Sequence, residues 1–279
     1  MRSLTLSSPA KVNLFLKVLG KRRDGYHELV TLFHRISLQD KIILRKIDHP
    51  SFRLITDHPK LKNPKQNLIY KAYRLLRKYA SWKGGVEVKL KKRIPLAAGL
   101  GGGSSNAAFF LIGMNQLFNL GLPQKKLVQL AAQLGADVPF FLYEVNQAIG
   151  RGKGEKITPY PALKKHWFVL VLSSFELPTS VVYRRLHAPA LTRISHDATI
   201  TSAFSGPLRN DLFDASCAIR PELKQLEALF DRLGARRRLM SGSGPTMFSI
   251  HKSKREAERM ARLIRRQRPK AKVFVCHTK

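Results

Sequence analysis

Hydrophobic and polar positions alternate near the start of the chain, which predicts two paired β-strands. Over residues 11–19, one face carries Val12, Leu14, Leu16 and Val18, and the other carries Lys11, Asn13, Phe15 and Lys17. Such alternation is typical of a half-buried strand. A turn at Asp24-Gly25 leads into a second alternating run over 30–38, so we expect the two runs to be antiparallel neighbours. Residues 41–58 predict a further strand followed by a loop.

Helical spacing follows this strand region. Apolar residues recur at every third or fourth position over 68–79, which predicts an amphipathic helix. The segment VEVKL at 86–90 predicts a short strand. Residues 104–118 suit a helix but have no polar face, so we expect that helix to be buried. Pro123 starts another helix, which is expected to end near Gly135.

The pattern changes from about residue 156. Strands are predicted at 167–172, 238–241, 246–250 and 273–276, and helices at 221–233 and 253–267. A glycine turn joins the two middle strands. This order suits a ferredoxin-like α+β arrangement with extra helices. We therefore expect two domains, residues 1–155 and 156–279.

The charge of the chain is unusual for a globular protein. Its 51 Lys and Arg residues face only 18 Asp and Glu residues, which gives a net charge of +33 and a pI near 10.8. Nucleic-acid binding, the handling of anionic small molecules, and origin in a cell with generally basic proteins all fit this excess. The basic residues are scattered, however, and no aromatic residues are interleaved with them as base-stacking surfaces require. We therefore expect no specific nucleic-acid partner, and some electrostatic attraction of phosphorylated ligands.

The two cysteines and the N-terminus point to a reduced, cytoplasmic protein. Cys217 and Cys276 match no metal-ligand spacing, so we expect two small buried side chains. Lys11 and Lys17 interrupt the first apolar run, which excludes a signal peptide there. No apolar run approaches the length that spans a membrane, so no membrane partner is expected.

A glycine-rich loop stands before the buried helix. Gly99, Gly101, Gly102 and Gly103 lie within five positions, and residues 94–124 contain no charged residue and no histidine. A glycine loop that leads into a helix directs backbone N–H groups and the positive end of the helix dipole at one point, which suits phosphate. The loop lacks the lysine of a Walker motif. It also has Ser104 where a dinucleotide fingerprint needs its third glycine.

Four further features are candidates for chemistry. Lys11 and Asn13 project from the same strand face, and Tyr26-His27 is suited to stacking on a planar ligand, although ordinary packing would explain either pair. A second glycine run, SGSGPTMF at 241–248, would by itself suggest a hairpin turn. Asp137 lies in apolar surroundings. It suits either a helix N-cap or a partly buried carboxylate paired with a lysine.

Together, PAKVNLFL (9–16), IPLAAGLGGGSSNAA (94–108) and SGSGPTMF resemble the three ordered motifs of the GHMP kinases, which are small-molecule kinases named for galactose, homoserine, mevalonate and phosphomevalonate. The longer forms PAKVNLFLKVLGKRRDGYHEL, GLGGGSSNAA and LGADVPFF resemble the members that act on a cytidine-diphosphate-linked methylerythritol in the non-mevalonate isoprenoid pathway. The matches run from Ser8 to about Ser249.

The resemblance implies a two-domain fold, with an ATP-binding domain at 1–155, a ferredoxin-like domain at 156–279 and the active site in the cleft between them. It implies transfer of the γ-phosphate of ATP, with Mg²⁺, to the tertiary C2 hydroxyl of the erythritol unit. Lys11 and Asp137 fall on the catalytic positions, and the metal ligands stay open. ATP would be bound by Pro95, Leu96, Ala97, Ala98, Gly99, Leu100, Gly101, Gly102, Gly103, Ser104 and Ser105. The cytidylyl-phosphate substrate would be bound by Asn13, Tyr26, His27, Thr179 and Tyr183.

Two alternatives stay open. One is another GHMP kinase, of the homoserine or mevalonate type, which would have no need of an aromatic pair around a base. The other is a basic nucleic-acid-binding protein, which would leave the glycine loops and Asp137 unexplained. The assembly is expected to be a monomer or homodimer. The segment AIGRGKGE (148–155) is longer than the corresponding family segment, so its place in the site is open.

Overall fold

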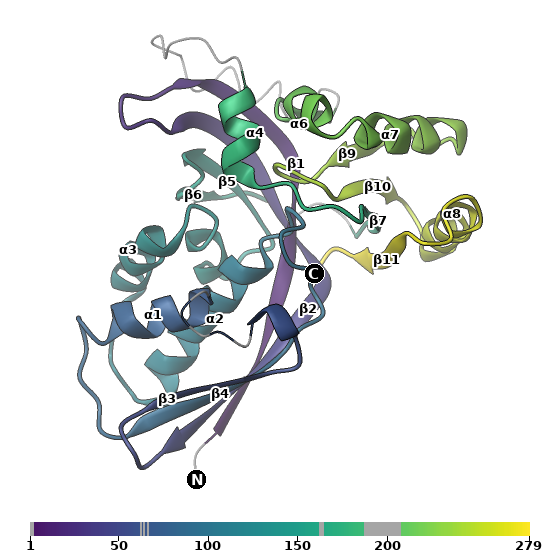
Figure 1. Ribbon diagram of the computed structural model, residues 1–279. Helices are drawn as coiled ribbons and strands as arrows, with labels where there is room; N and C mark the ends of the chain where they lie inside the picture. Colours follow the sequence, from purple (N-terminus) through teal and green to yellow (C-terminus); the bar gives the residue numbers. More distant parts are fainter. Residues whose placement is uncertain (1–2, 62, 64, 66, 162–164, 187–207) are drawn as a thin grey trace. The chain divides into compact units, whose positions relative to one another are not determined.

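The computed structural model describes residues 3–61, 63, 65, 67–161, 165–186 and 208–279. These residues form two compact units (Figure 1). The first unit consists of residues up to 10 together with 38–96 and 101–144, and the second of 11–37, 97–100 and 145–279. The long strands β1 (Ser3–Lys21) and β2 (His27–Ile47) run from one unit into the other.

The first unit packs helices against a sheet. Its strands β3 (Phe52–Thr56) and β4 (Gly85–Lys91) lie beside the end of β2, with β4 antiparallel to β2 and parallel to β3. The helices are α1 (Leu68–Leu76), α2 (Gly102–Leu117) and α3 (Gln124–Leu134), with 3₁₀ turns η1 (Pro59–Leu61) and η3 (Pro139–Leu142). A side chain at Gly113 of α2 would come within 2.4 Å of Leu44 and 2.6 Å of Leu6. The missing side chain thus lets the apolar helix lie directly on the strands.

The second unit contains two groups of strands. The hairpin of β5 (Gln147–Gly152) and β6 (Lys156–Pro159) pairs with β2, while β8 (Arg209–Asn210) runs parallel to β1. A separate antiparallel sheet has the order β11-β7-β10-β9. Its strands are β7 (Trp167–Leu172), β9 (Arg238–Met240), β10 (Met247–His251) and β11 (Lys272–His277). This is the strand order of a ferredoxin-like sheet.

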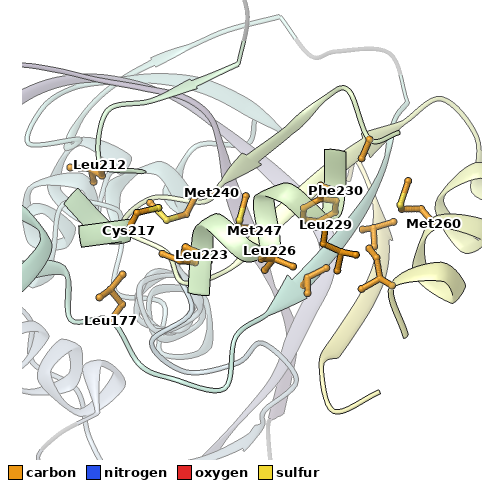
Figure 2. Close-up of a cluster of buried hydrophobic side chains, with 14 of the residues drawn as sticks. Leu177, Leu212, Cys217, Leu223, Leu226, Leu229, Phe230, Met240, Met247 and Met260 are labelled. Atoms are coloured by element: carbon orange, nitrogen blue, oxygen red, sulfur yellow. The ribbon is translucent and has the colours of Figure 1, made fainter. Parts of the chain in front are cut away.

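Helices and the antiparallel sheet together form the core of the second unit. In the part of the chain that the structure describes, four helices belong to this unit. They are α4 (Thr179–Arg185), α6 (Phe213–Ile219), α7 (Glu222–Arg232) and α8 (Lys254–Gln267). Figure 2 shows Leu223, Leu226, Leu229 and Phe230 of α7 in one apolar cluster with Met240, Met247 and Met260. Alternate residues of β7 face this cluster, and Phe168 instead contacts the rings of His34 and Phe248. The continuous apolar run of β7 therefore reflects burial on both faces.

Most elements expected from the pattern are present, and the ferredoxin-like α+β expectation is confirmed. The buried helix is α2, and ten of its residues are buried. The expected break between 38 and 41 is wrong, because β2 continues to Ile47, and the loop expected before His58 contains strand β3. Cys217 and Cys276 are free and buried, and burial raises the pKa of their thiols to about 11 and about 12. The boundary expected at residue 155 stays a prediction.

Candidate active site

The glycine-rich loop ends at the start of α2 in the conformation that its sequence suggested. Gly101 is the N-cap residue and is left-handed, with φ of 66°, and no side-chain hydrogen bond caps the helix. An anion at this end would therefore meet backbone N–H groups and the positive end of the helix dipole. Gly103 is exposed here and Ser104 is partly exposed, whereas Ser105 is buried.

The glycines of this loop serve different purposes. A Cβ atom at Gly99 would lie 2.2 Å from the carbonyl oxygen of Ser241, and one at Gly102 would lie 2.8 Å from Ile94 Cγ2. Those two glycines are needed for the packing of the protein itself. A Cβ atom at Gly103 would make only an ordinary contact, 3.5 Å from Leu68 Cδ1. Close packing therefore leaves the absence of a side chain at Gly103 unexplained, and an approaching ligand would explain it.

The two glycine runs contact each other within the second unit. Ser241 Oγ donates a hydrogen bond to the carbonyl of Gly99, at 2.9 Å. The amide of Asn210 holds the second run from behind, because Nδ2 donates to the carbonyls of Met240 (2.8 Å) and Gly242 (2.7 Å). The run at 241–248 is thus a turn, as its sequence alone would suggest, and it also supports the first glycine loop.

Lys11 and Asn13 are buried, with 3% and 2% of their surface exposed, so the expected half-buried strand is wrong at these positions. Lys11 Nζ donates to Asn13 Oδ1 at 2.6 Å, and Asn13 Nδ2 donates to Thr31 Oγ1 at 2.7 Å. Gly242 covers the pair, since a Cβ atom there would lie 3.2 Å from Asn13 Oδ1 and 3.4 Å from Lys11 Nζ. The Lys11 side chain is thus held in a fixed position by its neighbours.

The aromatic candidates separate into two places. The rings of His27 and Tyr183 are stacked, with centroids 5.2 Å apart. Burial, followed by the charge of Lys21, lowers the pKa of His27, so the imidazole is neutral at pH 7. Tyr26 is 58% exposed, and Lys153 Nζ lies over its ring at 4.2 Å. Lys153 belongs to the turn of the segment AIGRGKGE, which forms the β5–β6 hairpin.

Two polar candidates remain. Thr179, the first residue of α4, shares a 2.8 Å hydrogen bond with Ser243 Oγ of the second glycine run. Asp137 belongs to the first unit, in the turn between α3 and η3, and is partly exposed. The N-cap position of η3 is Val138, so the sequence-based alternative that made Asp137 the cap is wrong by one residue.

Sequence reasoning missed a buried carboxylate next to the glycine loop. Asp40 forms an ion pair with Lys92 and accepts hydrogen bonds from the amides of Arg93 and Ile94. Burial lowers the pKa of Lys92, and the charge of Asp40 opposes that shift. Nothing in the local pattern distinguishes Asp40 from a surface acid, because its partners lie more than fifty residues further along the chain.

Two properties of the described residues concern metal and membrane partners. No group of three or more His, Cys, Asp or Glu side chains is gathered there as a protein-built metal centre requires. A Mg²⁺ ion is commonly held by substrate phosphates, waters and one or two carboxylates, so this finding is compatible with magnesium that arrives with a nucleotide. No helix among these residues has the length and apolarity needed to cross a membrane.

Family comparisons agree with the fold and the loops. Residues 67–144 match the model of the GHMP kinases N terminal domain, and residues 202–270 match that of the GHMP kinases C terminal domain. The class of protein is therefore a GHMP kinase. A homoserine kinase from Cytophaga hutchinsonii shares the fold, with a TM-score of 0.74 at 19% identity over 100% of this chain and 95% of that chain.

Full-length relatives narrow the class. The chain is 38% identical to a 4-diphosphocytidyl-2-C-methyl-D-erythritol kinase from Syntrophus aciditrophicus, over 91% of this chain and 92% of that protein. It is 39% identical to the Moorella thermoacetica kinase of the same name, over 96% and 97%. A crystal structure of 4-(cytidine 5'-diphospho)-2C-methyl-D-erythritol kinase gives a TM-score of 0.81 at 34% identity, with 99% of this chain and 100% of that one covered. The chain therefore belongs to the 4-diphosphocytidyl-2-C-methyl-D-erythritol kinase family of GHMP kinases.

Proposed function

We propose that this protein transfers the γ-phosphate of ATP to the C2 hydroxyl of 4-diphosphocytidyl-2-C-methyl-D-erythritol, in the non-mevalonate route to isoprenoid precursors. The observation that carries this proposal is identity of 34–39% to relatives of that name, extending over nearly the whole of both chains. The uncapped start of α2 and the exposed Gly103 also support it, because backbone N–H groups there would be open to the phosphates of ATP. We further propose that the enzyme works in the cytoplasm, as a monomer or homodimer.

ATP would be held by backbone rather than by a fixed lysine within the loop. The proposed contacts extend from Pro95 to Ser105, and the triphosphate would approach the N–H groups at the start of α2. This mode of binding suits the loop, because Gly99 and Gly102 are required by packing while Gly103 is exposed. Mg²⁺ would bind with the triphosphate, where it supplies positive charge to the transferred group.

We propose that Asp137 accepts the proton of the C2 hydroxyl and that Lys11 stabilises the negative charge that develops on that oxygen. The oxygen then bonds to the γ-phosphorus, the bond from phosphorus to the bridging oxygen breaks, and ADP leaves. The hydrogen bond from Lys11 to buried Asn13 supports this role, because a preset ammonium needs little rearrangement when charge develops.

The acceptor would be recognised through its cytosine. His27 and Tyr183 are already stacked, and the neutral imidazole has both a donor and an acceptor for a base edge. Tyr26 would add a second ring, Asn13 a polar contact, and Thr179 a contact near the erythritol unit. A homoserine or mevalonate kinase has no base to place, so these rings favour a cytidylyl acceptor.

The proposal is tested by product analysis. Purified protein incubated with ATP, Mg²⁺ and the cytidylyl acceptor should give ADP and a new ³¹P phosphomonoester resonance from a phosphate on a tertiary carbon. The same mixture without acceptor should release ADP only slowly. Rapid ADP release without a new phosphomonoester, or a phosphate attached at another hydroxyl, would contradict the proposed reaction.

A further inference from the structure

A buried polar cluster lies at the base of the glycine loop, within the first unit. We call it the Asp40 cluster, and its members are Ser8, Asp40, Lys92, Ser105 and Asn106. Ser8, Asp40, Ser105 and Asn106 are buried, and the side chain of Lys92 is only 2% exposed. None of them received a role from the sequence except Ser105, as part of the loop. Five polar side chains gathered in an interior call for a reason beyond packing.

One carboxylate joins the members of this cluster. Asp40 Oδ1 accepts from the amides of Arg93 (2.7 Å) and Ile94 (2.8 Å), and Oδ2 accepts from Lys92 Nζ and from Asn106 Nδ2 (2.9 Å). Four donors converge on a side chain with no exposed surface. Such a carboxylate has one position and one rotamer, because any movement would leave several buried donors without their acceptor.

These bonds connect the two ends of the ATP loop. Arg93 and Ile94 stand immediately before Pro95, where the loop begins, and Asn106 lies in the second turn of α2, just after Ser105. Asn106 Nδ2 also donates to Ser8 Oγ at 2.9 Å, and Ser8 Oγ donates to Ser105 Oγ at 2.8 Å. Both flanks of residues 95–105 are thus held by the same carboxylate, because Arg93, Ile94 and Asn106 bond to it directly. Ser105 is linked to Asn106 through Ser8.

The charges also suit the helix start. Lys92 Nζ lies 3.0 Å from the point where a Cβ atom at Gly102 would stand, so an ammonium sits beneath the first residue of α2. Alone, that positive charge would be unfavourable next to the positive end of the helix dipole. Asp40 neutralises it by forming an ion pair with Lys92, so the helix start is not destabilised by the ammonium.

We propose that Asp40 is a positioning residue for ATP, whose carboxylate sets the spacing between the two flanks of the loop and so presets the N–H groups at the start of α2. This inference rests on the proposed ATP-dependent function. Asp40 touches neither substrate in the proposed reaction and acts through the loop. A buried ion pair of this kind gives little net stability compared with apolar packing, which favours a role in setting geometry.

The variant that tests the proposal is Asp40→Asn. It keeps the size of the side chain and one acceptor oxygen, but it removes the charge and turns an NH₂ group toward Lys92 and Asn106. We expect the KM for ATP to rise about tenfold or more, because small displacements of binding groups carry costs of this size. The KM for the cytidylyl acceptor should change by no more than about twofold, because Asp40 does not touch that substrate. A change of this size is smaller than the effect of losing one hydrogen bond. Amide hydrogen exchange over 101–106 should become faster.

Glu87→Gln is the matched control. Glu87 is equally buried in the first unit and pairs with Arg45 and Arg53, at 2.9 and 3.3 Å, away from the glycine loop. This variant should lower the Tm, yet leave the KM for ATP and the exchange rates over 101–106 unchanged. If the KM for ATP rises in proportion to the fall in Tm in both Asp40→Asn and Glu87→Gln, the positioning role is overturned.

A second variant applies if Asp40→Asn does not fold. Ser8→Ala removes only the serine bridge between Asn106 and Ser105, with no change of charge, and should raise both the KM for ATP and the exchange rates more mildly. If Asp40→Asn folds and its KM for ATP and exchange rates over 101–106 are unchanged, the proposal is overturned. If Asp40→Asn does not fold, unchanged values of the same two quantities in Ser8→Ala overturn it. Calorimetric titration with the non-hydrolysable analogue AMP-PNP distinguishes a failure of the proposed function from a failure of the role of Asp40. A wild type that does not bind AMP-PNP contradicts the proposed function. Equal binding by wild type and variant contradicts only the role of Asp40.

Discussion

Two adjacent glycines at the start of α2 should respond in opposite ways to the same substitution. Gly103→Ala adds a methyl group 3.5 Å from Leu68 Cδ1, which is an ordinary contact. Alanine is favoured over glycine in a helix by up to about 1 kcal/mol. We therefore expect the free energy of unfolding to stay equal or to rise slightly, with a gain in Tm of at most about 2–4 °C.

Gly102→Ala places its methyl group 2.8 Å from Ile94 Cγ2 and 3.0 Å from Lys92 Nζ. Both neighbours belong to the packed base of the loop, so they cannot move away without cost. Overpacking of this kind costs roughly 1–3 kcal/mol. The Tm of this variant should fall, whatever ligand the protein binds.

Activity separates packing from ligand binding. If the triphosphate approaches the backbone at Gly103, the alanine methyl group blocks it, and the KM for ATP should rise about tenfold or more, a loss of at least ~1.4 kcal/mol in binding. The assay combines thermal unfolding by circular dichroism with steady-state kinetics at varied ATP. A Gly103→Ala protein with normal Tm and normal KM for ATP would refute the argument that a ligand explains this glycine.

Three further predictions concern other residues. Asp137→Asn should lower kcat by several orders of magnitude while AMP-PNP binding, measured by calorimetry, changes little; near-normal turnover would refute its role as the proton acceptor. Tyr183→Ala should raise the KM for the cytidylyl acceptor by about tenfold or more, since base stacking contributes ~1–3 kcal/mol, and Tyr79→Ala, in the turn that follows α1, serves as the control that should not change it. Burial, with a smaller contribution from the charge of His166, lowers the pKa of His34 to about 4. The unfolded chain therefore takes up a proton at His34 between about pH 6.5 and pH 4 that the native state does not, so acidification should lower the free energy of unfolding by as much as roughly 3 kcal/mol. His34→Leu should flatten the pH dependence seen in urea unfolding, and an unchanged slope would contradict this assignment.

Local patterns were sufficient for most of the fold. Alternation identified β1 and the start of β2, helical spacing identified α1 and α7, and the missing polar face of α2 correctly indicated its burial. These signals are local, because each depends on neighbours within a few residues of the same strand or helix.

Local patterns could not predict burial that is caused by segments distant in the sequence. Lys11 and Asn13 occupy polar positions of an alternating strand, yet Gly242, more than two hundred residues away in sequence, covers them. Asp40 is similar, since its partners come from residues 92–106. The composition of the glycine loop predicts a phosphate site, but only the structure separates Gly99 and Gly102, which packing requires, from Gly103, which packing leaves open.

The stacked pair of His27 and Tyr183 bears on which acceptor this kinase uses. In the proposed function the stacked rings of His27 and Tyr183 bind a base, which homoserine, mevalonate and sugars lack. The most direct measurement of the central claim is therefore a coupled ADP-release assay that compares kcat/KM for the cytidylyl acceptor with kcat/KM for homoserine, mevalonate and galactose. We predict turnover with 4-diphosphocytidyl-2-C-methyl-D-erythritol and essentially none with the other three. Turnover with homoserine or mevalonate and none with the cytidylyl compound would contradict the account.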